Sequence, residues 1–196
     1  MSVFPPCNQR QLLHRRAIDV QVFAREDGHF DVEATLSDIK TRDLTLATGL
    51  RRAGEPIHDM LLHLVVDRSL NIVSAGSQTL AAPYPAQCGE HGDAYAALVG
   101  LNLMKGFRQS LRQALAGSRA CTHLTELCQV LPTAVIQAFA GLILDTREGS
   151  DSDTPPYQLD RCHALRRDGP VVQTHYPRWY QRTVETPPAD GARTPS

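Results

Sequence analysis

Apolar and polar positions alternate in the first part of the chain, which is the pattern of half-buried β-strands. Residues 18–36 alternate on both sides of Asp27-Gly28, a pair typical of the tight turn in a β-hairpin. Residues 57–80 contain a second pair of such runs, with a turn at residues 67–70. Between the pairs, residues 41–56 carry glycines and a proline among charges and are predicted to form a loop. The pattern predicts an antiparallel sheet of four or more strands.

The second half of the chain has a different period. Apolar residues recur at intervals of three and four from Asp93 to Leu115, which predicts two short helices or one long helix before Gly117. The same period returns from Thr122 to Leu144, with Pro132 marking a kink or a new start. Strands followed by helices predict an α+β fold in which the helices cover one face of the sheet.

The composition changes after Asp145. The segment "TREGSDSDTPP" has the glycine, serine, aspartate and proline content of a linker. We therefore expect a single α+β domain in residues 1–145. Residues 146–182 are expected to be a linker and a C-terminal segment that docks on this domain, and residues 183–196 a disordered tail.

Charge and hydropathy exclude several classes of protein. The formal net charge is -1 with the eight histidines neutral, so no nucleic-acid partner is indicated. No apolar run approaches the length of a membrane span, and the first ten residues lack the pattern of a secretory signal. We expect a cytoplasmic protein whose five cysteines are free thiols or metal ligands, and whose partner is a small molecule or another protein.

Thiol and imidazole side chains lie at the edges of several predicted elements. These groups are the donors that zinc and ferrous iron prefer. The candidates are found at the start of the third strand, in a loop rich in proline and glycine, and around a natural helix N-cap at Thr122: His58, Asp59, Cys88, Cys121 and His123.

Two other cysteines have different surroundings. Cys128 is in phase with the apolar positions of its helix and is predicted to lie in the core. Cys162-His163, in the C-terminal segment, is either a packing anchor, which we prefer, or a further ligand pair.

The order of elements and the placement of cysteines resemble those of the iron-sulfur cluster scaffold proteins and their sulfur-acceptor relatives. The segment "PIHDMLLHLVVDRSLNIVSA" is similar to the strand that carries a Cys-Gly-Asp ligand segment in that superfamily, and "AQCGEHGDAY" and "SRACTHLTEL" resemble its two later cysteine segments. The resemblance covers residues 54–145 and implies a site of His58 or Asp59 with Cys88, Cys121 and His123. Because Ile57 stands where the superfamily has its first cysteine, a single zinc or iron ion is favoured over an iron-sulfur cluster.

The chain also resembles an uncharacterised bacterial family, DUF2889. The similar segments are "GEPIHDM", "CTHL" with its following helix, and "LDRCHAL", so that the resemblance extends to about Trp179. This resemblance implies no activity.

Three functions are consistent with these observations. The preferred hypothesis is a metal-binding protein of scaffold-like fold with a mixed His/Asp/Cys site. The alternative is a zinc- or iron-dependent enzyme of small-molecule catabolism that acts on a carboxylate or acyl substrate, with Asp59 or His123 as proton carrier. In such an enzyme the substrate could be held by a cationic side chain, with candidates Arg15, Arg16, Lys40 and Arg51. The third hypothesis is an interaction domain without metal.

Overall fold

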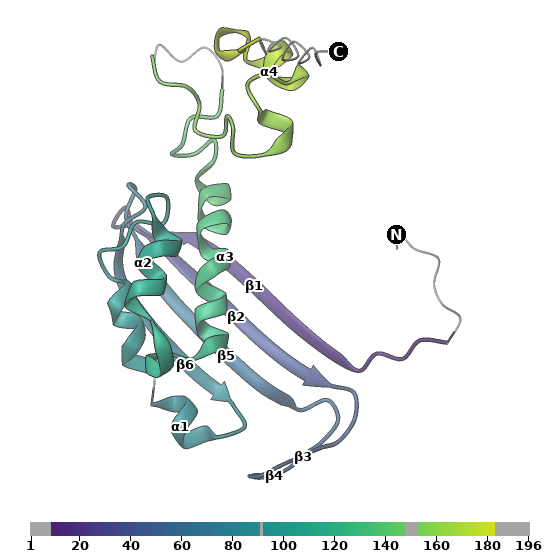
Figure 1. Cartoon of the computed structure of the whole chain (residues 1–196). Helices are drawn as coiled ribbons and strands as arrows, with labels where there is room; N and C mark the ends of the chain where they lie inside the picture. The colour runs from purple at the N-terminus through teal and green to yellow at the C-terminus, as the bar shows by residue number, and fades with distance from the viewer. Residues whose placement is uncertain (1–8, 91, 148–152, 183–196) are drawn as a thin grey trace, which may run out of the picture. The chain divides into compact units, whose positions relative to one another are not determined.

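The computed structural model describes residues 9–90, 92–147 and 153–182 (Figure 1). The chain divides into two compact units, Met1–Ala138 and Phe139–Ser196. The predicted tail at residues 183–196 lies outside the described residues. The docking of residues 146–182 on the first domain stays a prediction.

A four-stranded antiparallel sheet forms the base of the first unit, in the strand order β1-β2-β5-β6. Its strands are β1 (His14–Ala24), β2 (Phe30–Lys40), β5 (Pro56–Val66) and β6 (Ile72–Ala81). The turn between β1 and β2 lies at Asp27-Gly28 as predicted, and Gly28 has a φ of 83°, a conformation that glycine adopts without strain. With the helices that follow, the sheet confirms the predicted α+β fold.

The connection between β2 and β5 is more ordered than predicted. Residues 41–56 were expected to form a loop, but β3 (Leu44–Leu46) and β4 (Gly49–Arg51) pair there as a small antiparallel sheet. Gly49 has a φ of 127° and allows the chain to reverse between the two strands. The prediction of a loop was wrong here because three-residue strands are too short to produce a recognisable alternation.

The helices follow the sheet as predicted, with shorter elements than the period suggested. They are α1 (Pro85–Gly89), the 3-10 helix η1 (Gly92–Leu98), α2 (Phe107–Ala114), the 3-10 turn η2 (Gly117–Arg119) and α3 (Thr122–Phe139). Two short helices therefore occupy the first periodic segment. Pro132 lies inside the continuous helix α3, which ends at Phe139 and not at Leu144, because Gly141 turns the chain with a φ of 76°.

The core lies between one face of the sheet and the helices α2 and α3, which cross that face (Figure 1). Alternate residues of β2 are at most 6% exposed: Phe30, Val32, Ala34 and Leu36. From α3 the core receives Leu124, Leu127, Leu131 and Val135. Cys128 is fully buried among them, which confirms its predicted place in the core. The buried stripe of β2 continues for one more position, to the carboxylate of Asp38, which is 2% exposed.

The second unit consists of short elements. These are η3 (His163–Leu165), α4 (Pro170–His175) and η4 (Pro177–Trp179), with Leu159 and Val172 buried. The preferred packing role of Cys162 is wrong, since its side chain is exposed. Within the described residues, no helix has the length and apolar character needed to cross a membrane.

Candidate functional site

Asp38 is the one charged residue that is fully buried within the described part of the chain. Strand pairing places it directly opposite Arg16 of β1 and opposite His58 of β5. Residues paired across adjacent strands project from the same face of a sheet. The register therefore brings a carboxylate, a guanidinium and an imidazole together at one end of the core.

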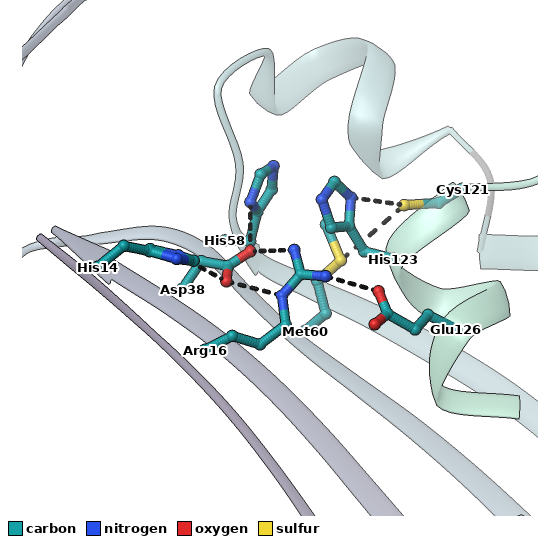
Figure 2. Close-up of polar contacts among 8 residues, drawn as sticks. All are labelled: His14, Arg16, Asp38, His58, Met60, Cys121, His123 and Glu126. Atoms are coloured by element: carbon teal, nitrogen blue, oxygen red, sulfur yellow. Dashed lines mark hydrogen bonds and ion pairs between the residues drawn. The ribbon is translucent and has the colours of Figure 1, made fainter. Parts of the chain in front are cut away.

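Both oxygens of Asp38 are fully engaged (Figure 2). Arg16 donates from Nε to Oδ1 at 2.8 Å and from Nη2 to Oδ2 at 2.7 Å, a bidentate pair. His14 Nε2 lies 3.0 Å from Oδ1, and His58 Nδ1 lies 3.0 Å from Oδ2. Each carboxylate oxygen thus has two nitrogen partners. These contacts to Asp38 fix the orientations of the Arg16 and His58 side chains.

The protonation state of Asp38 follows from two opposed effects. Burial raises the pKa of the carboxyl, but the hydrogen bonds and charges of Arg16 and His58 outweigh it and hold the pKa at about 2. The hydrogen bond to Asp38 also raises the pKa of Arg16 further above its usual range. Asp38 and Arg16 therefore form an ion pair at neutral pH, with the carboxylate buried and the guanidinium partly exposed.

The first turn of α3 completes the site from above the sheet. His123 stacks on His58, with 3.9 Å between ring centroids and an interplanar angle of 31°. One turn further along, Glu126 Oε2 accepts a hydrogen bond from Arg16 Nη1 at 2.6 Å. Arg16 consequently bridges Asp38 of β2 and Glu126 of α3.

His123 is kept in its neutral form. Burial lowers the pKa of its imidazole, and the electrostatic effects of His58 and Arg16 lower that pKa further. A neutral imidazole has a lone pair available for a metal ion or a proton. His123 can therefore act as a ligand or a base at neutral pH.

Cys121 directly precedes α3, so that it lies at the helix N-terminus as predicted. Its carbonyl oxygen accepts hydrogen bonds from the amide of Thr125 at 2.9 Å and from the hydroxyl of the buried Tyr95 at 2.9 Å. Its Sγ atom lies 3.8 Å from Nδ1 of His123 and 3.9 Å from Sδ of Met60. The backbone anchor thus holds the thiol beside the histidine pair.

Three of these side chains have the arrangement of a metal-ligand group. One ligand atom each from Asp38, His58 and His123 lie within 4.8 Å of one another, the one such group among the described residues. The sequence predicted His58 and His123 as ligands, and the fold brings them together although 65 positions separate them along the chain. The structure therefore contains a possible His/Asp site.

The other proposed ligands lie differently. Cys121 is beside the group but not part of it. Asp59 is paired with Ser37, and strand alternation turns its side chain to the opposite face from His58. Cys88 lies on α1 and not in the expected loop, and its carbonyl oxygen accepts a hydrogen bond from Thr79. Neither Asp59 nor Cys88 belongs to the group found within the described residues.

Sequence reasoning missed Asp38 altogether and could not place Arg16 at the site. A signal was present, because Asp38 continues the alternation that begins at Phe30 and therefore occupies a core-facing position. A charged residue at such a position is rarely buried without a partner. The arginine directly across the hairpin, Arg16, is that partner.

The cysteines are expected to differ sharply in reactivity. Burial raises the pKa of the Cys128 thiol to about 12, whereas Cys162 is exposed. Alkylation of the native protein with iodoacetamide at pH 8, followed by peptide mass spectrometry, should modify Cys162 and leave Cys128 intact until the protein is unfolded. Equal labelling of both thiols in the native protein would contradict the buried position of Cys128.

Comparison with known proteins gives a family but no activity. One family model, with the description "Protein of unknown function", matches residues 14–137. The matched segment contains every residue of the site, from His14 to Glu126. No curated protein and no solved structure matches the chain.

Proposed function

The chain belongs to the DUF2889 family of proteins of unknown function, and on this premise we propose from the site itself that the domain binds a single transition-metal ion. The ligands in this proposal are Asp38, His58 and His123. The observation that carries it is the convergence of their three ligand atoms, from two strands and a helix, within 4.8 Å. Two imidazoles and one carboxylate form a ligand set suited to ferrous iron or zinc.

The spacing of two ligand atoms is compatible with an octahedral ion such as ferrous iron. His58 Nδ1 and Asp38 Oδ2 are 3.0 Å apart. With bonds of about 2.1 Å, neighbouring ligands are about 3.0 Å apart in an octahedron and about 3.4 Å apart in a tetrahedron. The pair, which a hydrogen bond joins in the metal-free protein, is thus compatible with the edge of an octahedral ion, and two histidines with one carboxylate on one face are a known ligand set of ferrous iron.

Metal binding would replace the hydrogen bond between His58 and Asp38. In the metal-free protein His58 shares a hydrogen bond with Asp38, and the ion would take the place of that proton between Nδ1 and Oδ2. The remaining nitrogens on Asp38, from Arg16 and His14, would keep the carboxylate oriented. Because Arg16 already balances the charge of Asp38, we expect a moderate affinity for a divalent ion.

An enzyme is the second candidate function, for one structural reason. Three protein ligands on an octahedral ion leave coordination positions for water and substrate. A carboxylate or acyl substrate would suit such a Lewis-acidic ion. An iron-sulfur cluster has less support, because the ligand group contains no cysteine.

Metal analysis of single-histidine variants tests the proposed function. The protein, purified without an affinity tag and loaded anaerobically with ferrous iron or zinc, should hold one ion per chain after dialysis. His58→Ala and His123→Ala should weaken binding more than about a hundredfold, since even the partners that orient metal ligands contribute about ten- to a hundredfold. Inductively coupled plasma mass spectrometry and calorimetric titration would measure both.

His63→Ala is the matched control. His63 also lies on β5 and also contacts an aspartate, with Nε2 at 3.2 Å from Asp31 Oδ1, but it is outside the ligand group. Its replacement should leave metal binding unchanged. If the parent protein binds neither ion, or if His63→Ala weakens binding as much as His58→Ala, the proposed function is wrong.

A further inference from the structure

The sulfur atoms of Cys121 and Met60 lie close together beside His123. Cys121 Sγ is 3.9 Å from Met60 Sδ and 3.8 Å from Nδ1 of His123 (Figure 2). Met60 is 1% exposed, whereas Cys121 is half-buried and open to an incoming ion. We propose that Cys121, Met60 and His123 form a binding site for a soft monovalent metal ion, Cu(I).

The two donor separations that involve Cys121 match those of a three-coordinate ion. With a metal-sulfur bond of about 2.3 Å and a metal-nitrogen bond of about 2.0 Å, a planar three-coordinate ion has two sulfurs about 4.0 Å apart. The same bonds place sulfur and nitrogen about 3.7 Å apart. The structure has 3.9 Å between Cys121 Sγ and Met60 Sδ, and 3.8 Å between Cys121 Sγ and His123 Nδ1. Both agree to within about 0.1 Å, so Cys121 already stands at a suitable distance from each of the other two donors.

The chemistry of the donors selects the ion. A thioether binds hard or borderline divalent ions poorly, whereas thiolate and thioether together favour Cu(I). A Cys121 thiolate would neutralise a monovalent ion, and the neutral thioether and imidazole would add no charge. An uncharged complex is suited to a place where Met60 is buried in the core. A divalent ion with the same ligands would leave one uncompensated positive charge.

The copper site is distinct from the proposed iron or zinc site and does not depend on it. The two share only His123, through opposite ring nitrogens: Nδ1 faces Cys121, which leaves Nε2 for the divalent ion. A neutral imidazole has one free lone pair, so the two ions would compete for it. Cu(I) binding should consequently displace a divalent ion held by His58 and His123.

Anaerobic competition with a chromogenic Cu(I) chelator tests this inference. The parent protein should bind one Cu(I) per chain. Cys121→Ser should weaken binding by at least about a hundredfold and Met60→Leu by about tenfold, since both remove a sulfur donor. Leucine nearly conserves the volume of methionine, so Met60→Leu should stay folded, and circular dichroism would verify this. X-ray absorption at the copper edge should show two sulfur donors in the parent and one in Met60→Leu.

Two variants serve as controls. Cys88→Ser removes another half-buried thiol and should leave Cu(I) affinity unchanged. His58→Ala should lose the divalent ion and keep Cu(I), which separates this inference from the proposed function. The inference is wrong if Met60→Leu binds Cu(I) as tightly as the parent, if Cys88→Ser weakens binding as much as Cys121→Ser, or if no Cu(I) binds.

Discussion

Replacing Arg16 with methionine is expected to lower the free energy of unfolding by about 3 kcal/mol at pH 7. Methionine keeps most of the aliphatic stem, so the loss comes mainly from the carboxylate of Asp38, whose side chain is 3% exposed and would lose its guanidinium. Removing one partner of a buried pair costs about 3–5 kcal/mol, and the lower end applies because Arg16 is itself 33% exposed. Urea unfolding followed by circular dichroism would measure the change.

A double-mutant cycle tests the physical reason for that loss. If the cost comes from a buried carboxylate that has lost its guanidinium, Asp38→Asn added to Arg16→Met should restore about 1–2 kcal/mol, because the charge is then gone. Arg25→Met is the control, since Arg25 also bridges two aspartates but at the surface, and it should cost much less stability than Arg16→Met. Strictly additive effects of the two site variants would contradict the buried ion pair.

The strands and helices could be predicted from the sequence because their signals are local. Alternation around Asp27-Gly28 identified the β1-β2 hairpin, and the helical period placed Cys128 in the core of α3. The misplaced features have equally local causes. The strands β3 and β4 are three residues long, and the helix α1 that carries Cys88 has five residues, so each is too short to show a repeated pattern.

The site was only partly predictable because it depends on register. The pairing of Asp38 with Arg16 follows from the tight hairpin and could have been derived from the sequence. The pairing of Asp38 with His58 could not, because the intervening chain contains β3 and β4 and the register shifts after Asp38. The stacking of His123 on His58 further depends on how α3 packs across the sheet. Residue types alone therefore suggested His58 and His123, together with Asp59, which faces away.

Acid should remove the contribution of Asp38 to stability within a defined range of pH. The folded pKa is lowered from 3.8 to about 2, so the carboxylate stabilises the protein fully above pH 3.8. As the pH falls from about 4 to 2, the unfolded state takes up the proton first and this stabilisation is lost. The shift corresponds to about 2 kcal/mol.

The measurement compares the parent protein with Asp38→Asn in urea titrations between pH 5 and pH 2, a window below the usual range of histidine titration. The parent should be the more stable protein at pH 5, and the difference between the two should shrink by about 2 kcal/mol at pH 2. Glu33→Gln, an exposed change on the same strand, should follow the parent closely. Only a lowered pKa of Asp38 in the folded state makes the difference in stability between the parent and Asp38→Asn depend on pH. A difference that stays constant over this window would therefore mean that Arg16 and His58 do not hold Asp38 in its ionised form.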